Sequence, residues 1–390
     1  MEDKKQKNIL LIPSVFDNYG IIGSMEIIKD LISLGHTVTC YILDEFEERF
    51  KKSGAKLKTF KIDKTPLKNL PPYFAQRIYF SFTIGKFYDE ILNDALKSDE
   101  KYDFLIVDSF IDGNEINKIF KIPTVITLYS NPLGEKTPFI ELYAQKRLEF
   151  ILPVNKKYNL NIIDFLSIHF MAETKYKLML TSKLFQPQSL LSDNSFYFIG
   201  PSSQEEKPND ESFNFKKDEN KKLINISLVP ILSQNIDFFK LCVKAFGSSK
   251  EYQIIMDVGK RIDIKELGDL PENFSVFNNV PQSQILPQTD IIIIDGGIEA
   301  IHEVFYYNNK LPFILIKQDI NEFDNSKIIK KYEAGIVLND KKLTPEILNE
   351  VVTNYLINKS KYQKGMDIIS ESFKEAKSQR KEILEKIFGQ

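Results

Sequence analysis

The chain has 390 residues, with 52 basic and 54 acidic side chains and a formal net charge of -2 at pH 7. This balance excludes the strong positive field with which proteins attract nucleic acid or anionic membranes. A hydrophobic fraction of 43% supports a large core. Because single cores usually divide beyond ~250–300 residues, we expect two domains.

Cysteine usage and the N-terminus bear on the cellular compartment. Cys40 and Cys242 fall in different predicted domains, which argues against a disulfide framework and fits a reducing compartment. The apolar run after the charged N-terminus is too short to span a membrane, and no small-residue cleavage site follows it. We therefore expect a cytoplasmic protein without a transmembrane segment.

The first half of the chain alternates apolar strands with helical segments. The expected strands are Asn8–Val15, Thr37–Leu43, Lys56–Ile62, Phe104–Val107, Pro123–Tyr129 and Ser195–Gly200. The expected helices are Ile21–Leu34, Phe74–Leu96 and Gly113–Phe120. Such alternation predicts a doubly wound parallel sheet.

A polar segment with no apolar rhythm separates the two halves and indicates a linker. We place the domain boundaries accordingly. The predicted parts are a first domain over 1–203, a linker over 204–219, a second α/β domain over 220–361 and a charged C-terminal helical segment over 362–390.

The stretch 271–339 carries the clearest pattern in the second domain. Asp290–Ile294 is a continuous apolar run after its first residue, as expected for a parallel strand buried on both faces. Asp295-Gly296-Gly297 interrupts it, and a helical segment follows over Ile298–Tyr307. A glycine turn between a strand and a helix N-terminus directs backbone N–H groups and the positive end of the helix dipole to one place, which is a generic anion site.

Several short motifs occur in a fixed order over this stretch. They are Val280-Pro281-Gln282, Gly296-Gly297, Glu303, Leu311-Pro312, Asn325 and Gly335. The ordered set resembles the donor half of nucleotide-sugar glycosyltransferases of the bacterial macrolide and UDP-glycosyltransferase type. The resemblance implies the GT-B fold, which has two Rossmann-like doubly wound parallel-sheet domains facing across a cleft. It also implies a UDP- or dTDP-sugar as donor substrate, a small-molecule acceptor and no tightly bound cofactor.

The resemblance assigns donor-binding roles to particular residues. They are Pro281 and Gln282 for the base and ribose, Gly296 and Gly297 for the diphosphate, Glu303 for the ribose hydroxyls, and Asn321, Glu322 and Asn325 for the sugar. Structural alternatives stay open for most of them. Pro281 and Gln282 also suit a loop turn, Glu303 a solvated helix face, and Asn321 a helix N-cap.

The catalytic base of the family is missing. Family members carry a histidine sixteen residues before the position of His36, and counting back reaches Gly20. An acidic residue before the fifth strand orients that base, and Asp112 fits this position, with Asp108 close by. A carboxylate in an apolar setting can itself accept a proton, so Asp112 is our candidate base. The alternative is that Asp112 caps the helix beginning near Gly113.

The phosphate cradle is altered as well. The first loop of the family's donor domain reads Ser-Leu-Gly-Ser/Thr, and here Val229 and Pro230 follow Ser227-Leu228. Asp295 replaces a histidine and Ala300 a serine or threonine. A carboxylate beside a diphosphate repels it by roughly 1–4 kcal/mol at ~4 Å, unless a divalent cation lies between them. A divalent cation near Asp295 is therefore one expectation.

These changes leave three hypotheses. The first is a glycosyltransferase, inverting in mechanism, with an atypical site. The second is a catalytically inactive pseudo-glycosyltransferase that serves as a binding or chaperone module, for which a protein partner is expected. The third, a related GT-B epimerase, needs acid-base carboxylates in the cleft, for which Asp112, Asp295 and Glu322 are the candidates. Two further segments have open roles: 132–177 either shapes the acceptor pocket or packs on the sheet, and 362–390 either returns to the first domain or is a solvated helix.

Overall fold

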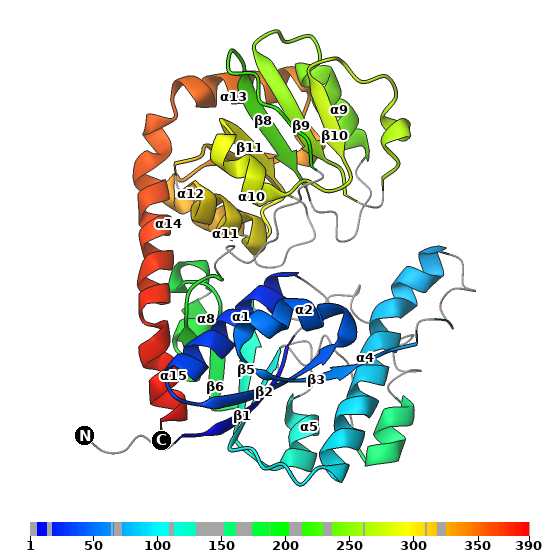
Figure 1. The fold of residues 1–390 in the computed structure, drawn as a ribbon. Helices are drawn as coiled ribbons and strands as arrows, with labels where there is room; N and C mark the ends of the chain where they lie inside the picture. The colour runs from blue at the N-terminus through cyan, green and yellow to red at the C-terminus, as the bar shows by residue number, and fades with distance from the viewer. Residues whose placement is uncertain are drawn as a thin grey trace. The chain divides into compact units, whose positions relative to one another are not determined.

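The structure is a computed structural model. It describes residues 6–13, 18–63, 65, 72–108, 113–129, 152–160, 174–186, 188–202, 213–228, 236–259, 262–308, 310–317 and 325–389. The chain divides into two compact units, one made of Met1–Ser203 with Phe373–Gln390 and the other of Gln204–Ser372. Each unit is built on its own sheet (Figure 1).

The sheet of the first unit has seven strands in the order β3-β2-β1-β4-β5-β6-β7, all parallel where they pair. Their bounds are β1 Asn8–Ile12, β2 Thr37–Leu43, β3 Lys56–Phe60, β4 Phe104–Asp108, β5 Thr124–Leu128, β6 Tyr176–Met179 and β7 Phe196–Phe198. The order reverses between β1 and β4, so the carboxyl ends of these two strands mark the switch point of a doubly wound sheet.

Helices cover both faces of this sheet. Their bounds are α1 Asn18–Ser33, α2 Glu47–Phe50, α4 Pro72–Lys97, α5 Gly113–Phe120 and α8 Gln188–Leu191. Apolar residues of α4 and α5 pack with one face of the strands in one core cluster. Apolar residues of α1 and α2 pack with the opposite face in a second cluster. Burial on both faces explains why the strands appear in the sequence as continuous apolar runs.

The C-terminal residues complete the second of these clusters. The chain ends in α14 Ser360–Ser378 and α15 Arg380–Phe388, and Leu384, Ile387 and Phe388 of α15 are fully buried in the core cluster that also contains α1. The two helices replace the single C-terminal helix expected from the sequence, with Gln379 between them. The first unit is therefore assembled from both ends of the chain.

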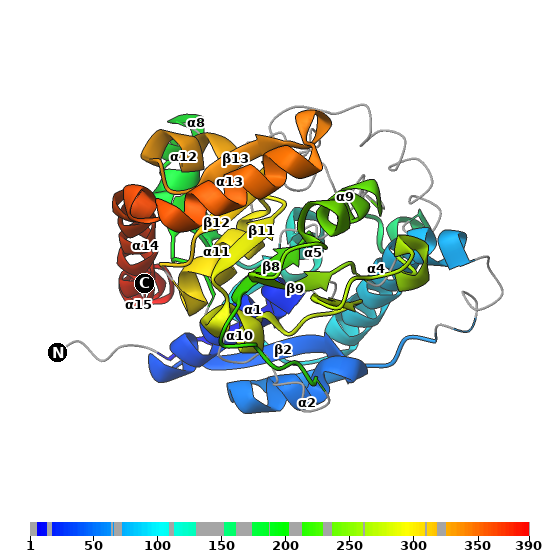
Figure 2. The ribbon, with the colours of Figure 1, turned by 90° about the horizontal axis from the view of Figure 1, so that it is seen from above.

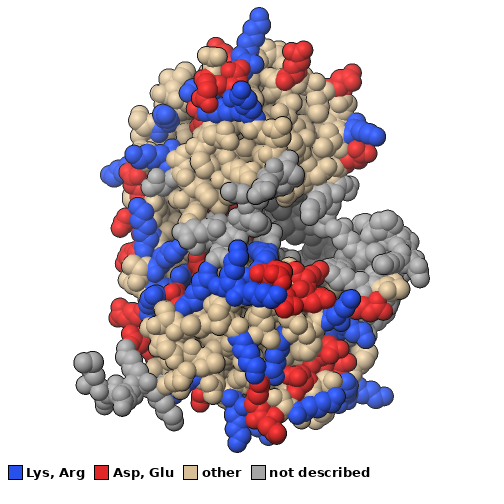
Figure 3. Space-filling model, viewed as in Figure 1, with Lys and Arg blue, Asp and Glu red and all other residues tan. Residues whose placement is uncertain are grey.

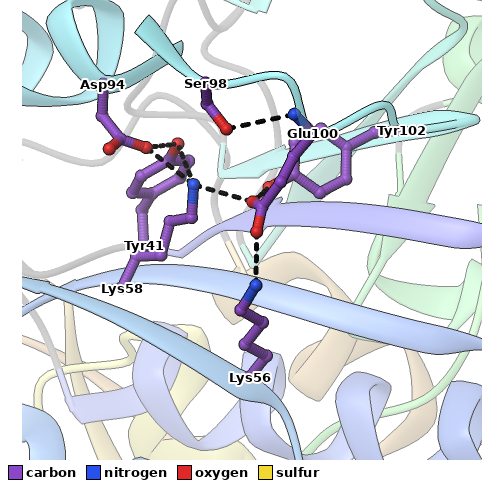
Figure 4. A network of polar contacts seen from close by, with 7 residues as sticks. All are labelled: Tyr41, Lys56, Lys58, Asp94, Ser98, Glu100 and Tyr102. Atoms are coloured by element: carbon purple, nitrogen blue, oxygen red, sulfur yellow. Dashed lines mark hydrogen bonds and ion pairs between the residues drawn. The ribbon is translucent and has the colours of Figure 1, made fainter.

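A network of polar side chains links the edge of the first sheet to α4 and the loop after it (Figure 4). Lys58 on β3 contacts Asp94 of α4 at 2.7 Å and Glu100 at 2.8 Å. Tyr41 on β2 donates to Asp94 at 2.6 Å, and Tyr102 donates to Glu100 at 2.6 Å. The Lys58 side chain is 17% exposed, so its charge is compensated mainly by these carboxylates.

The second unit repeats the architecture with six strands in the order β10-β9-β8-β11-β12-β13, again all parallel. Their bounds are β8 Lys222–Ser227, β9 Tyr252–Asp257, β10 Phe274–Phe277, β11 Ile291–Ile294, β12 Phe313–Lys317 and β13 Ile336–Asn339. Here the order reverses between β8 and β11.

Helices also lie on both sides of this sheet. Their bounds are α9 Ile236–Phe246, α10 Gln282–Ile285, α11 Ile298–Tyr307, α12 Asn325–Tyr332 and α13 Pro345–Ile357. α9 and α13 contact each other and share one large core cluster with the strands (Figure 2). On the opposite face of β8, Leu223 packs with Ile285 of α10 in a smaller cluster.

The predicted fold class, two doubly wound parallel-sheet domains, is confirmed. In the first sheet, β6 was not anticipated, because its four residues follow a stretch without strand periodicity. On the face shown in Figure 3, basic and acidic side chains are interspersed, consistent with the balanced composition. Among the helices that the structure describes, none combines the length and apolar character needed to cross a membrane.

Candidate nucleotide-sugar site

The switch point of the second sheet determines where a ligand site is expected. In open α/β sheets, ligands bind outside the carboxyl ends of the strands where the strand order reverses. In this unit those are the ends of β8, at Ser227, and of β11, at Ile294. The predicted glycine turn, Asp295-Gly296-Gly297, follows β11 directly, so it lies at this edge.

Gly296 cannot be exchanged for another residue without strain. Its φ of 82° lies in the left-handed region, which favours glycine. A Cβ atom at this position would come within 2.8 Å of the Leu315 side chain on the neighbouring strand β12. The turn leads at Gly297 into α11, whose first N–H groups and dipole favour an anion at this end.

The Asp295 side chain is already hydrogen-bonded to one backbone amide of this turn. Its Oδ1 accepts a hydrogen bond from the Gly297 N–H at 3.0 Å. A diphosphate that approached the same amide would meet this carboxylate. Within the described ranges no three His, Cys, Asp or Glu side chains are grouped in a way that could hold a metal ion. The divalent cation near Asp295 stays a prediction.

Asn325 is brought to the glycine turn from a distant part of the sequence. It is the first residue of α12, and its Nδ2 donates to the Gly296 carbonyl at 3.0 Å. Its Oδ1 is buried and has no hydrogen-bond partner in the part of the chain that the structure describes. The amide therefore supports the turn and retains an unused acceptor.

Pro281 and Gln282 begin α10 at the same side of the sheet. Pro281 is the N-cap residue, and Gln282 is 9% exposed. The Gln282 Oε1 accepts from Nδ2 of Asn225, a fully buried residue of β8, at 2.8 Å. Asp257, at the end of β9, accepts from the Val280 N–H at 3.0 Å and so fixes the loop just before them.

Three α11 residues complete the site region. Glu303 and Ala300 are half-buried, whereas His302 is 1% exposed. Burial lowers the pKa of His302 to about 3, so its imidazole is neutral at neutral pH. Burial of this kind agrees with a structural role for His302.

In the first unit, the position of the family base has no functional side chain. Gly20 lies in the first turn of α1, and its carbonyl accepts from the Tyr129 hydroxyl at 3.1 Å. Asp108, at the carboxyl end of β4, is fully buried. Because β1 and β4 are adjacent at the switch point, Asp108 and the start of α1 lie at the same edge of the sheet.

Several predicted residues lie outside the part of the chain that the structure describes. They are Asp112, Val229, Pro230, Asn321 and Glu322. Most of 132–177 also lies outside it. Their predicted roles in base catalysis, phosphate contact, sugar binding and acceptor binding stay predictions.

Two residues of the site region escaped the sequence reasoning. Asn225 interrupts an apolar strand, and a polar residue in a strand with apolar neighbours on both sides is a usable signal. Asp257 ends a strand of the same sheet, as Asp108 does in the first unit. In each unit, one strand of the parallel sheet thus ends in an aspartate.

The two parallel-sheet units define a class, the proteins with the GT-B fold. Residues 232–380 match the family described as Glycosyltransferase family 28 C-terminal domain. Over the whole length, the chain is similar to the solved glycotransferase of kitacinnamycin, with a TM-score of 0.72, 19% identity and coverage of 98% and 99% of the two chains. It is also similar to UGT89C1 of Arabidopsis thaliana complexed with UDP, with a TM-score of 0.70, 12% identity and coverage of 99% and 100%.

The sequence relatives agree with this class. The chain is 26% identical over 311 residues, 76% of each protein, to YdhE of Bacillus subtilis (strain 168), described as an uncharacterized UDP-glucosyltransferase. The chain thus has the GT-B fold and is similar in sequence to a bacterial protein described as a UDP-glucosyltransferase, as the resemblance in its donor half indicated.

Proposed function

We propose that the protein transfers a sugar from a UDP- or dTDP-sugar to a small-molecule acceptor, with inversion at the sugar carbon. The observation that carries the proposal is the glycine turn at the switch point of the second sheet, held by Asn325 and followed by the N-terminus of α11. This arrangement suits a diphosphate. One structural neighbour was solved with UDP, which supports a nucleotide donor for this chain.

Donor binding in this proposal combines four contacts. Gly296 and Gly297 approach the diphosphate, Gln282 and Pro281 contact the nucleoside, and Glu303 accepts from the ribose hydroxyls. A carboxylate suits two neighbouring hydroxyls because both of its oxygens accept hydrogen bonds. Asn321, Glu322 and Asn325 are proposed to orient the sugar.

Proton removal from the acceptor is assigned to a carboxylate at the end of β4 or shortly after it. Asp112 is the proposed base, and Asp108 is the alternative in the same segment. Asp108 ends β4 and Asp112 comes four residues later in the sequence. The carboxyl end of β4 lies beside that of β1, where the family places its base. A carboxylate can perform this step when an apolar setting raises its pKa toward the working pH.

Thermal unfolding with UDP, dTDP and their sugars, with and without Mg²⁺, tests donor binding. We expect an increase in Tm with at least one nucleotide and its loss in Glu303→Ala. Glu299→Ala, which removes an exposed carboxylate one turn earlier on the same helix, is the matched control. Absence of any shift at millimolar nucleotide contradicts the proposal. An unchanged shift in Glu303→Ala contradicts the role of that residue.

Turnover separates the enzyme from a binding module. We expect release of UDP or dTDP from the matching nucleotide sugar in the presence of acceptor alcohols, and its loss in Asp112→Asn with nucleotide binding retained. Activity lost only in Asp108→Asn moves the base to that residue. Nucleotide binding without turnover under all these conditions supports the pseudo-glycosyltransferase, whose carboxylate at position 295 competes for the Gly297 amide.

A further inference from the structure

Asn225 is an unusual residue for its place in the second sheet. It lies within β8, an inner strand of the sheet, between Ile224 and Ile226, and all three residues are fully buried. Parallel strands covered on both faces are ordinarily apolar throughout. An amide here loses its contacts with water, which is unfavourable unless its hydrogen bonds are replaced.

The protein replaces only some of the hydrogen bonds that the Asn225 and Gln282 side chains would make with water. Asn225 Nδ2 donates to Gln282 Oε1 at 2.8 Å, so one hydrogen bond joins the two side chains. Asn225 Oδ1 and Gln282 Nε2 are both buried, and neither has a hydrogen-bond partner in the ranges that the structure describes. An apolar pair would fill the same space without this cost. Local rules of this kind are broken mainly at functional sites.

The hydrogen bond with Asn225 determines which end of the Gln282 carboxamide is left for another partner. Because its Oε1 is already engaged by Asn225, the group that Gln282 has left for a further partner is the Nε2 donor. The backbone on the N-terminal side is fixed as well, since Asp257 accepts hydrogen bonds from Gly259 N–H and Val280 N–H, each at 3.0 Å. Side chain and loop are therefore both held before any ligand arrives.

We propose that Asn225 is a positioning residue for the nucleotide: it orients the Gln282 carboxamide so that its Nε2 donates to an oxygen acceptor on the nucleoside part of the ligand. This inference rests on the proposed function, because it assumes that the second unit binds a nucleoside diphosphate. Asn225 acts through Gln282 and does not touch the ligand. A preorganised donor binds more tightly than one that must first be ordered.

A double-mutant cycle on UDP affinity tests this coupling. The variants are Asn225→Leu, Gln282→Met and the double variant, measured by isothermal titration of UDP, with dTDP as a second probe, into the full-length protein. We expect each single variant to weaken binding about tenfold and the double variant to weaken it by about the same factor. Independent residues would instead give about a hundredfold loss in the double variant.

Asn349→Leu is the matched control. Asn349 Nδ2 donates to the Ala245 carbonyl at 2.7 Å between α13 and α9, on the opposite face of the same sheet. The Asn349→Leu substitution removes this side-chain hydrogen bond from the same unit, and we expect it to lower Tm without changing UDP affinity. A loss of affinity in this control equal to that in Asn225→Leu would assign the effect to general destabilisation and overturn the inference.

The outcomes separate the two proposals. If the wild-type protein binds neither nucleotide, the proposed function fails and the positioning role fails with it. If the wild type binds but the losses in the two single variants multiply, or Asn225→Leu binds as the wild type does, only the positioning role is overturned. If Asn225→Leu does not fold, Asn225→Ser in the same cycle supplies the measurement.

Discussion

At the scale of single residues, Asp295 is expected to weaken the binding of an anion at the glycine turn. Its carboxylate accepts from the Gly297 N–H, which is the kind of group that a diphosphate would use. It also brings a negative charge to the place where phosphate charge is expected. The glycine turn and the residue before it therefore have opposite effects on an anion.

Two substitutions separate these effects. Asp295→Asn removes the charge and retains an oxygen that accepts from Gly297, whereas Asp295→Ala removes both. We expect UDP affinity without Mg²⁺ to increase about tenfold in Asp295→Asn and further in Asp295→Ala, since one charge pair at ~4 Å contributes roughly 1–4 kcal/mol. Isothermal titration measures the change, with uridine, which lacks phosphate, as a probe that should respond to neither variant.

Weaker UDP binding in both variants would contradict this account. It would show that Asp295 assists the diphosphate, as expected if a divalent cation joins them. In that case the affinity of the wild type, but not of Asp295→Ala, should depend on Mg²⁺.

At the scale of elements, the network around Lys58 connects the outer strands of the first sheet to the end of α4. Hydrogen bonds from Lys56, Lys58 and Tyr102 lower the pKa of Glu100 to about 2. Burial acts to raise the pKa of Asp94, but hydrogen bonds from Lys58 and Tyr41 outweigh it, so this pKa is also lowered. Carboxylates with a lowered folded-state pKa stabilise the fold above their unfolded pKa of about 4, and this contribution disappears as the pH falls through the folded value.

Lys58→Met removes the central cation of the network. We expect the free energy of unfolding at pH 7 to fall by about 1–3 kcal/mol, because Asp94 loses its main cationic partner and Glu100 loses one of its two lysine partners. The difference in free energy of unfolding between Lys58→Met and the wild type should become smaller as the pH falls from about 5 to about 2, because protonation removes the charge on both carboxylates. Chemical denaturation over this pH range measures it.

Lys118→Met provides the control for this experiment. Lys118 is 55% exposed and pairs with Glu115 at 2.6 Å within one helix, so its loss should change stability by less than about 0.5 kcal/mol. If Lys58→Met changes the free energy of unfolding as little as Lys118→Met does, or by an amount that does not vary with pH, the network contributes little to the stability of the fold.

The elements themselves were largely predictable from local sequence. The run Ile291–Ile294 and the Gly296-Gly297 break lie next to each other in the chain, so apolar continuity and glycine chemistry were sufficient. The Asn225–Gln282 contact was not predictable, because it depends on how α10 packs on β8 across 57 positions. The same holds for Asn325 and Gly296, which are 29 positions apart.

At the scale of the whole molecule, the first unit depends on the last residues of the chain. Arg380 Nε contacts Asp30 Oδ2 at 2.6 Å, and Arg380 Nη1 contacts Glu26 Oε2 at 2.6 Å. These three side chains are 9–12% exposed, so the pairs that join α15 to α1 are nearly buried. Sequence periodicity showed a helix in the tail, but which unit the tail packs on depends on contacts across 350 positions.

Arg380→Met should destabilise the first unit by about 3–5 kcal/mol, because it leaves two nearly buried carboxylates without their closest cation. The matched control is Lys381→Met, since Lys381 is 61% exposed and lies 3.7 Å from Asp30. Hydrogen exchange of α1 and α15 peptides locates the effect. Equal protection in Arg380→Met and the wild type would show that apolar burial of α15 is sufficient to hold it.

The measurement that tests the central claim most directly is hydrogen–deuterium exchange of the wild-type protein with and without millimolar UDP or dTDP. We predict slower amide exchange in the peptides covering Val280–Ile285 and Asp295–Glu303, and no change in peptides of α13. Unchanged exchange in both segments with either nucleotide, with and without Mg²⁺, would contradict a nucleotide site at the carboxyl ends of β8 and β11.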